Sequence, residues 1–224
     1  MGPTLPQPCL CLVTDRRVGD QDTLVDRIGE AVAGGVDMVQ LREKDLPGGE
    51  LLRLANSIKR AIGGRALLII NERVDVAVAA AADGVQLGEN ALPPAAARRI
   101  VGPQALIGRS VHSQKGAARA AAEAADFLVV GAMYGTRSHP GATPAGPALM
   151  SRIARWLEQM ASPVPLIGIG GITSANLGEV MRAGAAGVAV ITSLLASPDP
   201  GEETRTLKRA MLEAWTPGGP DAPG

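Results

Sequence analysis

The segment MVQLREK, residues 38–44, ends an apolar run with a dense cluster of polar side chains. Gln40, Arg42 and Lys44 alternate along the chain, so an extended backbone would place all three on one face. Two cations can hold an anion such as a phosphate, and an amide can hydrogen-bond the edge of a heterocycle. The alternative is a salt-bridged rim with no ligand, and the segment alone leaves both open.

Other polar clusters also follow apolar runs. Asn71 and Glu72 end the run ALLIIN and offer an amide and a carboxylate that can ligate a metal. Ser110 and His112 follow LIGR, where a packing or rim role is expected for the histidine. No Ser–His–Asp order, Cys–His spacing or zinc-type cluster is recognisable, so the sequence indicates neither a covalent nucleophile nor a zinc site.

Two further segments suit an anion. LIGIGGITSANL contains Gly170 and Gly171, whose backbone amides can approach a phosphate in front of a helix that Ser174 would start. AVITSLL, with Ile191 and Thr192, adds amides and a hydroxyl. Close packing of the backbone is the alternative explanation of the glycines. The loop GTRSHPG, residues 135–141, either closes over a phosphate or forms a surface turn.

These clusters need elements that bring them together, and the chain alternates short apolar runs with longer amphipathic stretches. The nearly continuous apolar runs predict parallel strands covered by helices. The strand candidates are 9–15, 37–42, 66–71, 84–88, 106–111, 126–133, 165–171 and 187–193. The helix candidates are 22–34, 49–62, 74–81, 93–101, 114–123, 145–160, 174–183 and 201–214.

Eight such units predict an α/β fold, a single (β/α)8 TIM barrel over residues 1–215, followed by a disordered tail at 216–224. An open doubly wound sheet shares the alternation, but no GxGxxG follows the first strand. Active sites of such barrels lie at the carboxyl ends of the strands. The polar clusters above all fall there, which favours one composite site.

Composition excludes several classes of protein. The 22 basic and 22 acidic residues cancel and aromatic residues are scarce, so no nucleic-acid partner is expected. The start shows no signal peptide, and no apolar run approaches the roughly 18 residues that span a bilayer, which predicts a cytoplasmic protein without a membrane partner. Cys9 and Cys11 are expected to be buried free thiols. An oligomer is compatible with the sequence.

Together, QLREK, IINER, GVQLG, GRSVHS, the GT-S loop, GIGGIT and ITS resemble the thiamine phosphate synthase and thiazole tautomerase family, over residues 9 to 214. The resemblance implies a (β/α)8 barrel that joins a hydroxymethylpyrimidine diphosphate to a thiazole phosphate and releases pyrophosphate, with the use of Mg²⁺. The small-molecule partners would be these pyrimidine and thiazole phosphates. A tautomerase of the same family would instead isomerise a thiazole carboxylate phosphate and need no cofactor.

The resemblance also assigns roles by position. The expected substrate contacts are Gln40, Leu41, Arg42, Glu43, Lys44, Asn71 and Ser110 for the pyrimidine diphosphate, and Thr136, Arg137, Ser138, His139, Gly170, Gly171, Ile191 and Thr192 for the thiazole phosphate and the loop over it. The residues expected to act in catalysis are Arg42, Lys44, Ser110 and His139. Charge neutralisation and alignment would be their task.

The sequence departs from the synthase pattern at the metal. In the family pattern two aspartates bind the metal and a lysine contacts pyrophosphate. In this chain the first aspartate is replaced by Glu72, the second by Ala91 and the lysine by His139. The tautomerase is the alternative, although its histidine aligns with Ala132, so that His139 or His112 would have to serve. A non-catalytic binder of thiazole or thiamine phosphate is the third hypothesis.

Overall fold

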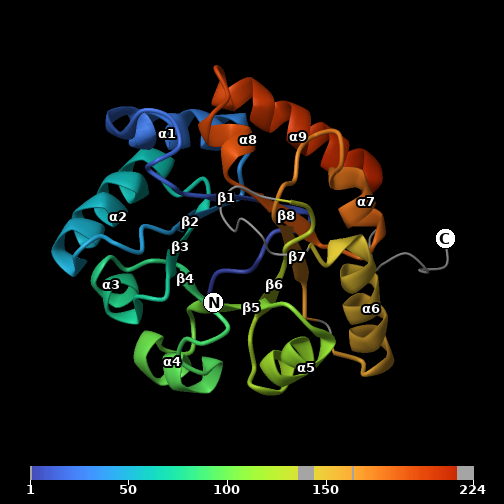
Figure 1. Ribbon diagram of the computed structural model, residues 1–224. Helices are drawn as coiled ribbons and strands as arrows, with labels where there is room; N and C mark the ends of the chain where they lie inside the picture. Colours follow the sequence, from blue (N-terminus) through green and yellow to red (C-terminus); the bar gives the residue numbers. More distant parts are fainter. Residues whose placement is uncertain (1, 136–143, 163, 216–224) are drawn as a thin grey trace.

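The computed structural model describes residues 2–135, 144–162 and 164–215. Eight parallel strands form a closed barrel in the order β1 to β8, and β8 pairs with β1 (Figure 1). The predicted (β/α)8 barrel is therefore confirmed. Its strands are β1 (Cys9–Val13), β2 (Met38–Leu41), β3 (Leu67–Asn71), β4 (Gly84–Leu87), β5 (Leu106–Val111), β6 (Phe127–Gly131), β7 (Leu166–Ile169) and β8 (Gly187–Val190).

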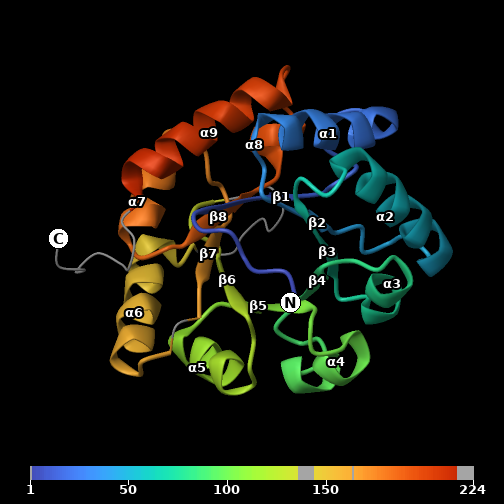
Figure 2. The same ribbon diagram turned by 180° about the vertical axis from the view of Figure 1, so that it is seen from behind.

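The helices form a ring outside the strands in both views (Figures 1 and 2). They are η1 (Gln21–Thr23), α1 (Leu24–Gly34), α2 (Gly48–Ile62), α3 (Val74–Ala79), α4 (Pro94–Val101), α5 (Gln114–Ala122), α6 (Gly146–Gln159), α7 (Leu177–Arg182), α8 (Thr192–Leu195) and α9 (Pro200–Ala214). Among the described residues, no helix is long and apolar enough to cross a membrane. The predicted tail, 216–224, lies outside these residues.

Two differences from the sequence prediction lie at the carboxyl ends of β7 and β8. Ser174 does not start a helix, because the Asn176 side chain holds residues 171–176 in a turn and α7 begins only at Leu177. Thr192 and Ser193 belong to α8 rather than to the preceding strand. Leu194 and Leu195 in this helix are buried.

The apolar side chains form two layers. One fills the space between strands and helices, and the other, which includes Cys9, Cys11 and Phe127, fills the barrel interior. Strand alternation explains the division, because neighbouring residues point to opposite faces. Both thiols are free and buried, as predicted, and burial raises the pKa of Cys11 to about 12.

Three aspartates close the amino-terminal end of the barrel. Asp37, Asp83 and Asp126 precede β2, β4 and β6, and each carboxylate accepts a hydrogen bond from a backbone amide of the preceding strand (2.7 Å). Lys208 and Arg98 pair with the first and third of them. These three aspartates thus stabilise the starts of strands and lie at the end of the barrel away from the predicted site.

The chain before β1 covers the same end. Leu5 packs against the interior cluster, and Gly2 lies against Gln104 in the connection between α4 and β5. The amino terminus accordingly lies over the middle of the ring in Figures 1 and 2. The open end of the barrel interior is therefore the opposite, carboxyl end.

Candidate active site

The inner wall of the barrel is polar on one side of its carboxyl end. Gln40, Asn71, Gln86 and Ser110 come from the four successive strands β2 to β5 and share the inward parity of the interior cluster. The Gln40 Nε2 amide donates to Asn71 Oδ1 (3.1 Å), and the Gln86 Nε2 amide donates to Ser110 Oγ (3.0 Å). Three of these four residues were predicted as substrate contacts, and the structure brings them onto one wall.

The opposite part of the inner wall is apolar. Val13 and Val129 are buried members of the interior cluster, and Ile169 and Ile191 are half-buried against it. A flat heterocycle between the two walls would meet hydrogen-bonding amides on one side and dispersion contacts on the other. The carboxyl end of the barrel interior is therefore polar on one side and apolar on the other, which no single strand segment of the sequence indicates.

Arg42 and Lys44 follow β2 at the edge of the polar wall. The backbone N–H of Arg42 donates to Thr14 Oγ (2.9 Å), while the Thr14 N–H donates to the Gln40 carbonyl (2.9 Å), which fixes the end of β2 against β1. Within residues 2–135, 144–162 and 164–215, no carboxylate pairs with the Arg42 guanidinium or the Lys44 ammonium. Both cations are therefore available to an anion.

The carboxylates of the same segment are already neutralised by the loop after β1. Arg16 binds Glu43 through its backbone N–H (3.0 Å) and its guanidinium (3.1 Å), and it forms a two-bond pair with Asp45 (2.7 Å each). Arg17 adds one bond to Asp45 (2.9 Å). Hydrogen bonds from Arg16 hold the pKa of Asp45 well below its usual value. A salt-bridged rim exists, but it leaves the two cations of QLREK free.

Two of the predicted contacts therefore have other partners. The Glu43 carboxylate is buried against Arg16, and the Leu41 side chain is buried in the layer between strands and helices. Leu41 can reach a ligand in the barrel only through its backbone, because its side chain points to the outer face of β2.

Glu72 follows Asn71 in a strained conformation. Its φ of 59° lies in the left-handed region, which costs a non-glycine residue about 1 kcal/mol or more. The backbone N–H of Glu72 donates to the Gln86 carbonyl (2.9 Å), and its exposed carboxylate lies so close to Gly88 that a Cβ there would overlap it. This backbone conformation thus places the Glu72 carboxylate across the carboxyl end of β4.

The loop after β4 holds Ala91, the predicted position of a missing metal ligand. Arg109, only 8% exposed, donates to the carbonyls of Glu89 and Leu92 (2.8 Å each) and fixes this loop. The Glu89 carboxylate lies 3.0 Å from His112 Nδ1. His112 is exposed and so lies at the rim, as predicted. Among the described residues, no group of three or more His, Cys, Asp or Glu side chains could enclose a metal.

Gly170 and Gly171 form a turn against the chain after β6. Both have positive φ (106° and 63°), and a Cβ on Gly171 would lie 2.5 Å from the Gly135 carbonyl oxygen. The Tyr134 N–H donates to the Gly170 carbonyl (2.9 Å). Close packing therefore accounts for these glycines, and phosphate binding by their amides stays a prediction.

The end of β8 lies beside this turn, because Ser193 Oγ donates to the Ile172 carbonyl (2.7 Å). Ile191 and Thr192 are thereby brought near Gly170 and Gly171, as one composite site requires. The other residues predicted for the thiazole end, Thr136, Arg137, Ser138 and His139, lie outside the described residues.

Tyr134 anchors the chain that leads into the loop GTRSHPG. Its hydroxyl donates to Glu179 Oε2 (2.9 Å) and lies 3.1 Å from the Asn176 carbonyl. Burial, together with the Glu179 carboxylate, raises the pKa of Tyr134 to about 12.

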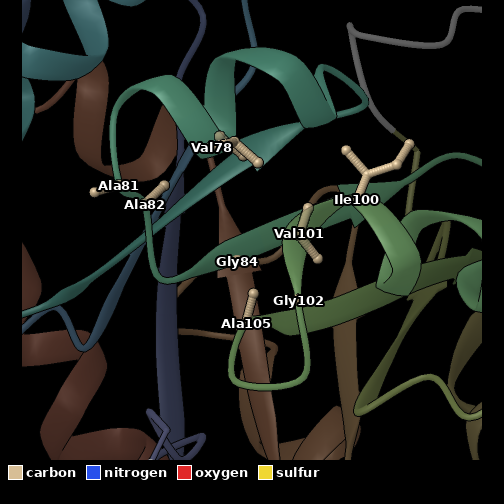
Figure 3. A pocket seen from close by; sticks show the side chains of 9 residues that line it. Val78, Ala81, Ala82, Gly84, Ile100, Val101, Gly102 and Ala105 are labelled. Carbon is tan, nitrogen blue, oxygen red and sulfur yellow. The ribbon is translucent and has the colours of Figure 1, made fainter.

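Two cavities lie on different sides of the molecule. One, of about 210 Å³, lies between the end of β5 and α5 and is lined by Glu89, the strand residues 109–111 and residues along the length of α5, with Ser110 as its one contact with the polar wall. The other, of about 240 Å³, is lined by small and apolar residues between α3 and α4, with Val78 and Ile100 at its rim (Figure 3). It lies near the starts of β4 and β5, at the opposite end from the polar wall, and so does not belong to the candidate site.

Sequence reasoning missed Gln86 and Arg16. Gln86 stands between Gly84 and Leu87 in a recognised motif, and its inward parity in β4 was a usable signal. Arg16 follows the first predicted strand, but its partners lie 27 and 29 residues away and no local pattern could indicate them.

Comparison with known proteins points to one family. The model of the thiamine monophosphate synthase family matches residues 10–194. A thiamine-phosphate synthase of Methanoculleus marisnigri is 44% identical over 211 residues, covering 93% of this chain and 98% of that protein. One of Roseiflexus castenholzii is 42% identical over 200 residues, covering 88% and 85%.

A solved structure is also similar. Thiamine phosphate pyrophosphorylase from Pyrococcus furiosus matches with a TM-score of 0.82 and 31% identity, covering 93% of this chain and 97% of that one. The resemblance inferred from the motifs is thereby confirmed over nearly the whole barrel. The chain belongs to the thiamine monophosphate synthase family.

Proposed function

We propose that this protein is a thiamine phosphate synthase, a transferase of thiamine biosynthesis. It joins a hydroxymethylpyrimidine diphosphate to a thiazole phosphate and releases pyrophosphate. Relatives that carry this name match nearly the full chain at more than 40% identity. The observation in the structure that supports it most directly is the pair of cations, Arg42 and Lys44, which have no carboxylate partner in the part of the chain that the structure describes and follow the strand that carries Gln40.

The arrangement suits a dissociative displacement. The bond between the pyrimidine methylene carbon and the diphosphate oxygen breaks, its electron pair leaves with pyrophosphate, and the thiazole nitrogen then bonds to the carbon. Arg42 and Lys44 stabilise the charge that accumulates on the departing oxygens. The amides of Gln40 and Asn71 orient the pyrimidine, and the apolar wall excludes water from the carbocation.

A magnesium ion fits this site through one protein carboxylate. The Glu72 carboxylate is exposed, has no hydrogen-bond partner among the described residues and lies across Gly88, on the side of β4 that adjoins Asn71. Mg²⁺ often takes one or two carboxylates and completes its shell with phosphate oxygens and water. When bound, it would neutralise the charge of the diphosphate. Ala91 offers no side-chain ligand.

The tautomerase alternative has less support. Its histidine would stand at Ala132, whose side chain lies against Gly170. The described histidine, His112, pairs with Glu89 at the rim of the barrel. A purely binding role would be consistent with the same pocket, so only an assay of chemistry separates it from the synthase.

One assay decides among the three. Purified protein is supplied with both substrate sets, with Mg²⁺ or with chelator, and pyrophosphate, thiamine phosphate and the thiazole tautomers are measured. The synthase predicts pyrophosphate release that requires Mg²⁺. Metal-independent tautomer conversion would replace the proposal by the tautomerase, and binding without any chemistry would replace it by the binder.

The remaining attributes belong to the same proposal. The partners are small pyrimidine and thiazole phosphates, and the enzyme acts in the cytoplasm. His139, which aligns with the family's lysine for pyrophosphate, is assigned to the departing group by the resemblance alone.

A further inference from the structure

Gln86 occupies a place that the roles assigned above do not explain. Its side chain is on the inner face of β4 and the residue is only 2% exposed, between Asn71 on β3 and Gly108 on β5 in the strand register. Its Nε2 donates to Ser110 Oγ (3.0 Å) and lies 3.5 Å from the Leu87 carbonyl. Gln86 thus belongs to the polar wall but is buried within it, and its amide N–H contacts the neighbouring Ser110.

The other end of the same amide has no hydrogen-bond partner. Gln86 Oε1 is the one buried side-chain polar atom without a partner among the described residues. It lies over Gly108, where a Cβ would overlap both Oε1 and the Phe127 ring edge at Cζ and Cε2. The edge of an aromatic ring is its positive part, so it favours the amide oxygen over the amide N–H. The environment therefore fixes Nε2 toward Ser110.

This orientation decides what the Ser110 hydroxyl can do. One oxygen lone pair of Ser110 receives the Gln86 N–H, so its own proton is not drawn toward Gln86. The hydroxyl proton remains free for an acceptor in the mouth of the barrel. A buried amide with an unsatisfied oxygen is costly, and such costs persist mainly where they serve a site.

We propose that Gln86 is a positioning residue that holds Ser110 as a hydrogen-bond donor to the departing pyrophosphate. This inference rests on the proposed function for the identity of the anion. Ser110 donates to a phosphoryl oxygen as negative charge develops there. Gln86 orients the Ser110 hydroxyl without contacting the substrate. A neutral hydroxyl that donates to an anion gives a charge-assisted hydrogen bond.

The first test measures the affinity of inorganic pyrophosphate, with Mg²⁺, by titration calorimetry on four proteins: wild type, Gln86→Met, Ser110→Ala and the double variant. We expect Ser110→Ala to bind about tenfold more weakly and Gln86→Met about threefold to tenfold more weakly. Because Gln86 acts through Ser110, the double variant should bind no more weakly than Ser110→Ala. Multiplying losses in the double variant would overturn the proposal.

The second test reverses the direction of the hydrogen bond. In Gln86→Glu, an ionised carboxylate accepts the Ser110 proton, whereas the neutral acid can still donate. Pyrophosphate affinity should match the wild type at low pH and fall about tenfold or more as the introduced group ionises. Gln159→Glu, at an exposed position on α6, is the matched control and should follow the wild type throughout.

Charge repulsion alone would also weaken binding in Gln86→Glu, and Ser110→Ala separates the two effects. If the loss at high pH is equally large without the hydroxyl, the carboxylate acts by charge and the proposal is overturned. Far-UV circular dichroism of each variant checks folding. If the wild type makes thiamine phosphate and Gln86→Met binds pyrophosphate as tightly as the wild type, this inference is refuted and the proposed function stands. A wild type that does not bind pyrophosphate refutes both.

Discussion

Arg16 is expected to stabilise the barrel and to keep the phosphate cations free, and Arg16→Met tests both roles. The substitution keeps most of the apolar stem and removes the guanidinium. Glu43 would keep the bond from the backbone N–H of residue 16 and lose the charged one, in an environment where its side chain is only 3% exposed. Hydrogen bonds to charged groups contribute about 1.5–3 kcal/mol, so we expect a loss of about 2 kcal/mol of unfolding free energy.

The magnitude can be measured as a melting temperature. For a chain of this size, 1 kcal/mol shifts Tm by about 2–4 °C, so Arg16→Met should melt about 4–8 °C lower. The neighbouring Arg17 is the matched control, because its side chain is 72% exposed and it binds Asp45 alone. Exposed ion pairs contribute little, so Arg17→Met should shift Tm by about 2 °C or less.

A rescue variant tests the cause. Arg16→Met combined with Glu43→Gln no longer buries an unpaired charge, so it should regain most of the lost Tm. In the single variant, Glu43 and Asp45 would also compete for Arg42 and Lys44, which should raise the KM for the pyrimidine diphosphate more than it lowers kcat. Equal Tm shifts for Arg16→Met and Arg17→Met, or no rescue, would refute the reasoning.

Three further outcomes follow from the same structure. In denaturant titrations, Gly171→Ala should lower the free energy of unfolding by about 2–4 kcal/mol, because its Cβ would overlap the backbone. Gly64 has a similar φ of 73° but open space around it, so Gly64→Ala should lower that free energy by only about 1 kcal/mol. Equal losses for the two variants would contradict the close-packing explanation of Gly171. Tyr134 is the chain's one tyrosine, so the phenolate absorbance should titrate near pH 12 in the folded protein and near the ordinary pKa of 10 after unfolding. The stability that this raised pKa contributes is present below pH 10 and is lost as the pH rises through 12. In Glu179→Gln the folded midpoint should move down, and an unchanged midpoint would remove that carboxylate as a cause. Glu72→Gln should raise the Mg²⁺ concentration for half-maximal turnover about tenfold or more, and an unchanged Mg²⁺ dependence would exclude Glu72 as a ligand.

Much of the scaffold could be predicted from local patterns alone. Eight apolar runs separated by amphipathic stretches predicted eight strands, and each lies within a few residues of its predicted place. Gln40 and Asn71 could be placed on the inner wall because alternation in a strand and the common edge of parallel strands are local or topological rules. The helix start predicted at Ser174 was wrong, because a side-chain turn centred on Asn176 outweighs helix propensity there.

By itself, the sequence determined the barrel, the end at which polar groups gather, and the family to which the motifs belong. Only the tertiary structure decided which charges of QLREK are free, because Arg16 reaches Glu43 and Asp45 from the neighbouring strand's loop. It also decided the direction of the Gln86 amide, which depends on Phe127 two strands away. Such pairings depend on distances across the barrel, and those distances exist only after the strands have closed.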